Sequence, residues 1–220
     1  MSDVDSVDEN WEPGDAGDRS LIGDAFLAVV RMHRRLDVGS DGVDVSVRLV
    51  EVGDATALTE LLQANREFLA PWDPVRDDAY FTEKRQRVDL EQVLERHGQR
   101  LVIPYVITVE GQVVGRITVN DVVRGAFESA HLGYWVGQAV NGLGVATAAV
   151  AEVVRLAFTE LGLHRLQADT LVHNAASQRV LARNGFIRIG LAPQYLRIAG
   201  RWQNHVLHQR LNDQWTPPEG

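Results

Sequence analysis

The chain has 220 residues, of which 45% are hydrophobic and 24% are charged, a composition typical of one globular domain with at most an appendage. It contains no cysteine, which excludes disulfides, thiolate metal sites and a cysteine nucleophile. The net charge is −8, but seven acids and a single arginine lie within residues 1–20, so the rest of the chain is close to neutral. A near-neutral body argues against nonspecific nucleic-acid binding, which needs concentrated positive charge.

The N-terminal segment is acidic rather than basic and then apolar, so it does not read as a signal peptide. No apolar run approaches the ~20 residues that cross a bilayer. We therefore expect a cytoplasmic protein without membrane contact. By composition we divide the chain into an acidic, disordered tail at 1–20, a helix and linker at 21–42, one main domain at 43–213 and a short tail at 214–220.

Hydrophobic periodicity and turn residues predict the following elements in chain order: a helix at 21–36, a strand at 45–50, helices at 55–69 and 82–97, strands at 105–109, 113–119 and 130–136, a helix at 144–160, a strand at 164–170, a helix at 175–183, and strands at 194–199 and 203–211. Asp54 and Asn174 stand where N-caps are expected. This order predicts an α/β fold, in which a mixed, mostly antiparallel twisted sheet is flanked by helices and includes one βαβ unit.

A glycine-rich turn separates the strand at 130–136 from the long helix that follows it. It reads Asn141-Gly142-Leu143-Gly144-Val145-Ala146-Thr147. Glycines let the main chain approach a phosphate, and the first N–H groups of a helix point at an anion with the favourable end of the helix dipole. The turn therefore predicts a site for a phosphorylated cofactor.

A dinucleotide is one candidate, since Asp169 lies 25 residues past Gly144, roughly where a ribose-binding acid would stand. Three observations oppose it. The third glycine position of Gly-x-Gly-x-x-Gly is Thr147, five residues (137–141) separate the strand from the first glycine, and the preceding strands form a meander rather than alternating βα units.

The same turn resembles the phosphate loop of the GNAT acyltransferases, [Gln/Arg]-x-x-Gly-x-[Gly/Ala], with Asn141 in place of the usual first residue. Within that superfamily the chain is similar to the RimJ/RimL-type ribosomal-protein N-terminal acetyltransferases. The resemblance covers residues 45–212, and its further motifs are Phe68-Leu69-Ala70-Pro71-Trp72, Leu132-Gly133-Tyr134-Trp135-Val136, Gly200-Arg201-Trp202 and the segment from Asn174 to Phe186.

The resemblance implies a GNAT fold with a βαβ acetyl-CoA-binding unit and acetyl-CoA as the acetyl donor. It implies that main-chain N–H groups of the turn hold the pyrophosphate and that the pantetheine arm lies along the strand at 132–136. The cofactor-binding residues it implies are Trp135, Val136, Asn141, Gly142, Leu143, Gly144, Val145, Ala146, Thr147, Asn174 and Ser177. We expect no metal, because His205 and His208, three apart on a strand, point to opposite faces and no carboxylate cluster supports them.

The resemblance also implies catalytic roles. Ser177 would protonate the departing thiolate, His131 stands where many relatives carry an acid on the strand, and Tyr195 would face the acceptor. A purely structural interpretation stays open for each: Asn174 and Ser177 as an N-cap and a first-turn serine, His131 and Tyr195 as half-buried strand residues.

No obvious buried acid stands in the sequence to serve as a strong base. An α-amine has a pKa of about 7.7–8.0, whereas that of lysine is about 10.4, so an α-amine needs less help to lose its proton. We therefore expect the acceptor to be the N-terminal amine of a protein, with a ribosomal protein as the first candidate. A small-molecule amine is the alternative acceptor, and a non-catalytic acyl-CoA-binding module is the alternative function. Assembly into a homodimer also stays open.

Overall fold

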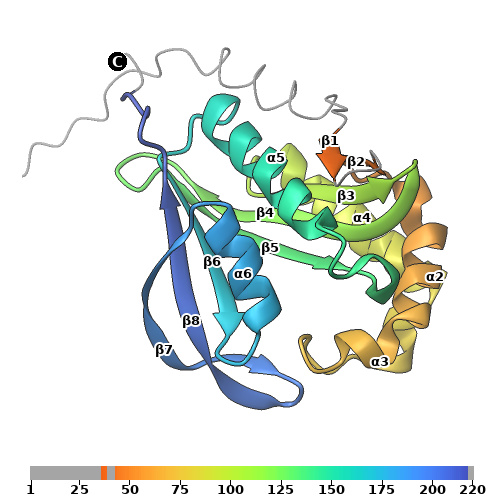
Figure 1. The fold of residues 1–220 in the computed structure, drawn as a ribbon. Coiled ribbons are helices and arrows are strands. Elements are labelled where there is room, and N and C mark those ends of the chain that lie inside the picture. The colour runs from red at the N-terminus through yellow and green to blue at the C-terminus, as the bar shows by residue number, and fades with distance from the viewer. Residues whose placement is uncertain (1–35, 39–42, 218–220) are drawn as a thin grey trace, which may run out of the picture.

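The computed structural model describes residues 36–38 and 43–217. The predicted acidic tail and the helix prediction up to residue 35 lie outside these residues. Leu36, the last residue of that helix prediction, instead begins a short strand, β1 (Leu36–Val38). The described part of the chain forms one open sheet with strand order β1-β2-β3-β4-β5-β6-β8-β7, flanked by helices (Figure 1).

The remaining strands are β2 (Val43–Leu49), β3 (Ile103–Val109), β4 (Gln112–Val123), β5 (Ser129–Val136), β6 (Arg165–Leu171), β7 (Ile187–Ile198) and β8 (Arg201–Leu211). The helices are α2 (Ala55–Ala64), α3 (Arg66–Leu69), α4 (Glu83–Gly98), α5 (Val145–Thr159) and α6 (Ala175–Arg183), with 3₁₀ turns η2 (Val52–Asp54), η3 (Asp78–Phe81) and η4 (Gln138–Val140). Of the pairs in this sheet, β5–β6 is parallel and the others are antiparallel. The predicted α/β fold with a mixed, mostly antiparallel sheet is confirmed.

Helices cover both faces of the sheet. On one face α5 and α6 pack on β2 to β6, with Val150, Val153 and Leu181 fully buried, and on the other face α2 and α4 bury Leu58 and Leu90 (Figure 1). Burial of each such side chain stabilises the fold by about 1.5–3 kcal/mol. None of the described helices is long and apolar enough to cross a membrane.

The helix predicted over 55–69 is divided by Asn65, which is buried and separates α2 from α3. The Asn65 amide nitrogen donates to the Leu61 carbonyl (2.8 Å), and its amide oxygen accepts from the Gln138 N–H (2.7 Å). This second bond ties the helix pair to the loop after β5. The break therefore has a tertiary cause that the helical periodicity of the segment does not contain.

Asp54 precedes α2, as predicted, but its side chain does not cap that helix. Its carboxylate instead pairs with the Arg48 guanidinium (2.8 Å for one of the two bonds) and accepts from the Glu51 N–H (2.8 Å). The backbone of Asp54 is already helical because η2 runs directly into α2. The N-cap prediction was wrong in this respect, since a buried ion pair takes the carboxylate.

The two C-terminal strands were located from sequence, but their extent and order were not. β7 begins at Ile187, seven residues before the predicted start. β8 lies between β6 and β7, so β7 forms the edge of the sheet (Figure 1). Ile187, Ile189 and Leu191 do alternate along this segment, so a strand signal was present, but Pro193 interrupts the run and weakens a strand prediction.

Stability should decrease in mild acid because of buried histidines. His97 on α4 is buried, its Nδ1 lies 2.8 Å from the Val102 carbonyl, and burial lowers its pKa. As the pH falls below the ordinary value of about 6.5 the unfolded chain takes up a proton that folded His97 resists, so the free energy of unfolding decreases. Burial lowers the pKa of His208 as well, with the same sign.

Urea unfolding at pH 7.5 and 5.5 measures this decrease in the free energy of unfolding. We expect the decrease to be smaller in His97→Gln, because glutamine keeps a side-chain donor but does not titrate. In the control His173→Gln, at an exposed position, we expect the same decrease as in the wild type. An equal decrease in His97→Gln and the wild type would contradict the assignment.

Candidate functional site

A cleft of about 390 Å³ lies between α3, β5, the turn after η4 and α6. We call it the glycine-loop cleft. Every predicted cofactor-binding residue lines it except Leu143, whose side chain is 62% exposed and whose N–H donates to the Val140 carbonyl. Its other lining residues are Phe68, Leu69, Trp72, Tyr134, Val140, Ala176, Arg179, Val180 and Arg183.

The turn at the mouth of α5 has the geometry of an anion site. Gly142 and Gly144 have φ of +84° and +88°, a region that strains residues with a Cβ. The first bond of the α5 ladder runs from the Ala148 N–H to the Gly144 carbonyl (3.0 Å), so the N–H groups from Val145 to Thr147 precede the ladder. Together with the helix dipole they provide donors for a phosphate at the cleft wall.

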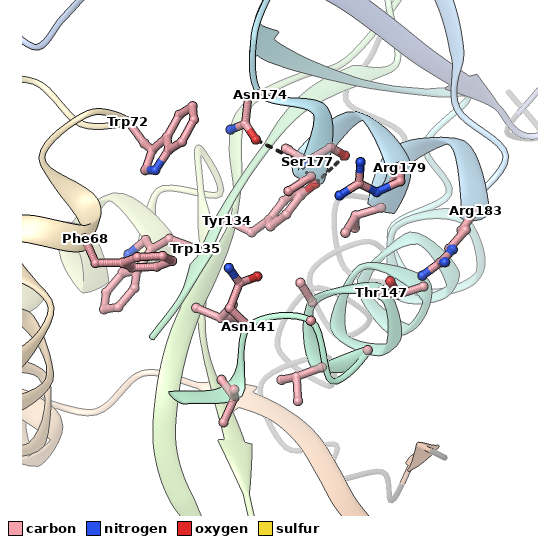
Figure 2. A pocket seen from close by; sticks show the side chains of 18 of the residues that line it. Phe68, Trp72, Tyr134, Trp135, Asn141, Thr147, Asn174, Ser177, Arg179 and Arg183 are labelled. Carbon is pink, nitrogen blue, oxygen red and sulfur yellow. Dashed lines mark hydrogen bonds between the residues drawn. The ribbon is translucent and has the colours of Figure 1, made fainter. Parts of the chain in front are cut away.

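Two cations that sequence reasoning did not assign stand beside these donors. Arg179 and Arg183 on α6 are four residues apart, which places them on one helix face, and both line the cleft (Figure 2). Neither forms an ion pair with a residue that the structure describes. The signal was present in the sequence as the i, i+4 spacing after Asn174. They suit the phosphates of a polyanionic ligand.

A pair of hydroxyl groups lines the cleft. The Ser177 Oγ and the Tyr134 hydroxyl are 2.8 Å apart, and the Tyr134 hydroxyl also lies within donating distance of the Ser177 carbonyl, at 3.2 Å (Figure 2). Burial raises the pKa of Tyr134 to about 12, although the bond to Ser177 acts to lower it. Asn174 accepts from the Ser177 N–H (3.1 Å) as the N-cap of α6, as predicted. The cap therefore fixes the place of Ser177 at the cleft.

A second cavity, of about 430 Å³, opens beside the first; we call it the polar cavity. It shares Leu69, Trp72, Tyr134, Trp135, Asn174 and Ser177 with the glycine-loop cleft. About half of the residues that line only this cavity are polar: Asp73, Arg76, Tyr80, Arg116, Thr118, Asn120, Asp169, Thr170 and His205. The two cavities meet where β5 and β6 part, because the last register pair of these parallel strands is His131–Gln167. A donor and an acceptor can therefore reach one point from two directions.

The family of this chain follows from its sequence match. The family described as Acetyltransferase (GNAT) domain matches residues 44–187, which includes the glycine turn, both hydroxyl groups and the parting strands. The chain belongs to the GNAT acetyltransferase family. The dinucleotide alternative is thereby excluded, and the predicted acetyl donor, acetyl-CoA, agrees with the anion site and the cations beside it.

Individual relatives are similar over most of their length. The chain is 35% identical over 173 residues to the [Ribosomal protein uS5]-alanine N-acetyltransferase of Escherichia coli, which covers 78% of this chain and 89% of that relative. The crystal structure of the ribosomal-protein-S5-alanine acetyltransferase of Vibrio fischeri superposes with a TM-score of 0.77 at 31% identity, over 84% of this chain and all of that one. RimJ of Mycobacterium smegmatis in complex with CoA-disulfide gives 0.78 at 31% identity, over 84% and 88%.

Two residues predicted to be catalytic lie apart from the hydroxyl pair of this GNAT protein. His131 of β5 stands opposite Asn120 and Gln167, before the strands part, and lines neither cavity. Tyr195 is 36% exposed on β7, and its ring lies 5.6 Å from that of His205, which lines the polar cavity. Burial, with the Asp169 carboxylate nearby, raises the pKa of Tyr195. Tyr195 therefore stands beside the polar cavity, whereas His131 does not reach it.

The GNAT site contains an acid that the sequence did not place there. Asp169 of β6, considered above only for a ribose, lines the polar cavity, and the Gln167 amide nitrogen lies 3.2 and 3.3 Å from its two carboxylate oxygens. It was missed because its position depends on the parting of β5 and β6. Within residues 43–217 no three histidine or acid side chains gather as a metal site would need.

Replacement of Gly144 by alanine should weaken CoA binding. Alanine at a left-handed φ costs about 1–2 kcal/mol, and relief of that strain would turn the N–H groups at the start of α5 away. We expect the Kd of CoA, measured by calorimetry, to rise about five- to thirtyfold. Gly53→Ala is the matched control, because an added Cβ there meets nothing within 4 Å and φ is not positive. An unchanged Kd in Gly144→Ala would contradict the phosphate assignment.

Proposed function

We propose that this protein transfers the acetyl group of acetyl-CoA to the N-terminal α-amine of a protein, with a ribosomal protein as the expected acceptor. One observation carries the proposal: the glycine-loop cleft and the polar cavity share a wall at Tyr134, Trp135 and Ser177. An acetyl donor in the first and an amine in the second would meet there. The relatives named as ribosomal protein N-acetyltransferases support this choice of acceptor.

The chain's own groups would divide the work of binding the donor. The N–H groups that begin α5, with Arg179 and Arg183, would hold its phosphates. The edge of β5 from Leu132 to Val136, which β6 no longer pairs, would align the pantetheine arm along Trp135 and Val136. A main-chain N–H on that edge would polarise the thioester carbonyl as charge develops on its oxygen.

In the transfer itself the amine nitrogen attacks the carbonyl carbon, the carbon–sulfur bond breaks and the sulfur leaves as a thiolate. The thiolate needs a proton, and the nitrogen must lose one. Ser177, hydrogen-bonded to Tyr134, is placed to donate to the sulfur, with Tyr134 relaying the proton or supplying it. Asp169, on the polar-cavity side, is placed to attract the ammonium form of the amine and to receive its proton. We place this reaction in the cytoplasm, as the sequence predicts.

The direct test offers acetyl-CoA with three acceptors: a peptide with a free N-terminus, a peptide with an internal lysine and a blocked N-terminus, and a panel of small amines. We expect acetylation of the free N-terminus at the highest kcat/KM. Comparable rates on the lysine peptide would contradict the preference for α-amines, and turnover of small amines alone would support the small-molecule alternative. Stabilisation by acetyl-CoA without turnover of any acceptor would indicate a binding module.

The hydroxyl pair yields a second prediction. Ser177→Ala should lower kcat about a hundredfold or more while the KM for acetyl-CoA changes little, because general acid catalysis acts in the transition state. Tyr134→Phe shows whether the phenol takes part: an equal loss indicates a relay, a small one indicates Ser177 alone. Ser46→Ala is the control, since the Ser46 hydroxyl also has a hydroxyl partner, Thr108 at 2.7 Å, but lies outside both cavities. Unchanged kcat in both Ser177→Ala and Tyr134→Phe would rule out the role.

A further inference from the structure

One cation in the polar cavity has no carboxylate partner among the described residues. Arg116 of β4 lines this cavity, and none of the described residues forms an ion pair or hydrogen bond with its guanidinium. Its Nε is buried and lacks a hydrogen-bond partner. Burial lowers the pKa of the Arg116 guanidinium, although the Tyr80, Asp89 and Asp54 side chains act to raise it. Such a charge is costly for the fold on its own.

Asp54 and Asp89, the carboxylates that act electrostatically on Arg116, are already paired with other arginines. Asp54 accepts two bonds from Arg48, one of 2.8 Å, and the Asp89 carboxylate lies 2.9 Å from the Arg85 guanidinium. In the wall of the cavity itself, Asp73 lies 3.5 Å from Arg76. Of the two arginines that line the cavity, Arg76 thus has a carboxylate partner among the described residues and Arg116 does not. The Arg116 guanidinium is therefore available to a carboxylate of a bound ligand.

The opposite end of the cavity carries a negative charge. Asp169 is held by the neutral amide of Gln167, and no described residue forms an ion pair with it. Strand register places Arg116 opposite Trp135 of β5, whereas Asp169 of β6 is two residues beyond Gln167, the partner of His131. The strands β4 and β6 lie two strand spacings apart, and the positions of Arg116 and Asp169 differ by two residues along the strand direction. The Cα atoms of Arg116 and Asp169 are therefore at least about 12 Å apart.

We propose that Arg116 forms a carboxylate subsite of the polar cavity and that the preferred acceptor is a peptide N-terminus followed within a few residues by aspartate or glutamate. The α-amine lies toward Asp169 and the hydroxyl pair, and the acidic side chain pairs with Arg116. A free amino acid does not fit both ends, because its amine and carboxylate are attached to one carbon. An extended peptide advances about 3.3 Å per residue, so an acid at positions 2 to 5 spans the cavity. This inference rests on the proposed function.

The test compares peptides with a free N-terminus that differ at one place. In a neutral host peptide, glutamine at each of positions 2 to 5 is replaced in turn by glutamate, and kcat and KM are measured with saturating acetyl-CoA. We expect glutamate at one position to lower KM about ten- to a hundredfold with kcat little changed, because a charge-assisted bond then forms in both the ground state and the transition state.

Three variants assign this preference to Arg116. Arg116→Gln should bring the glutamate and glutamine peptides to equal KM. Arg116→Lys should keep part of the difference, since lysine retains the charge but not the two-pronged geometry. Arg87→Gln, the same change of charge at an exposed residue of α4 that pairs with Glu83, should keep all of it.

The outcomes separate this inference from the function on which it rests. Equal KM for all peptides with the wild type, while each is acetylated, would overturn the subsite and leave the proposed function standing. A preference for glutamate that persists in Arg116→Gln would overturn the role of Arg116. Binding of acetyl-CoA without acetylation of any peptide would overturn both. If Arg116→Gln does not fold, the wild-type series and Arg116→Lys still decide.

Discussion

The site depends on the point at which β5 and β6 stop pairing. These parallel strands share three register pairs, the last of which is His131–Gln167, and then part. Beyond that point β5 remains paired to β4 as far as Val136, and β6 remains paired to β8 as far as Leu171. Neither strand can close the gap without losing its ladder on the other side. The backbone groups along the gap therefore have no partner strand on that side and are available to a ligand.

The two sides of this gap offer different chemistry. On one side the N-terminus of α5, Arg179 and Arg183 form a positive wall suited to phosphates. On the other side the wall carries one cation, Arg116, and one acid, Asp169, that form no ion pair with a described residue. The Ser177–Tyr134 pair lies where the sides meet. Because two substrates can reach this pair from opposite directions, the acetyl group can pass directly from one to the other without a covalent intermediate on the protein.

Sequence patterns predicted the local structure correctly wherever that structure depends on contacts between residues close in the chain. The Asn174 cap reaches the N–H of Ser177, three residues on, and the glycines of the turn need only their own left-handed φ. Prediction was wrong where a distant partner takes over a local group. Asn65 divides a helix because it binds Gln138, 73 residues away, and the Asp54 carboxylate serves Arg48 rather than a cap.

By itself the sequence determined the α/β class and the family, and it predicted the glycine turn as the anion site for the acetyl donor, because each depends on motifs of a few consecutive residues whose conformation is set locally. Only the tertiary structure decided which side chains line the polar cavity, the proposed acceptor side. Asp169 reaches the polar cavity, His131 does not, and Arg116 stands there without an ion-pair partner among the described residues. These facts depend on which strands are neighbours and in what register. The alternation along a strand shows that two faces exist, but it does not show which residue of another strand lies opposite.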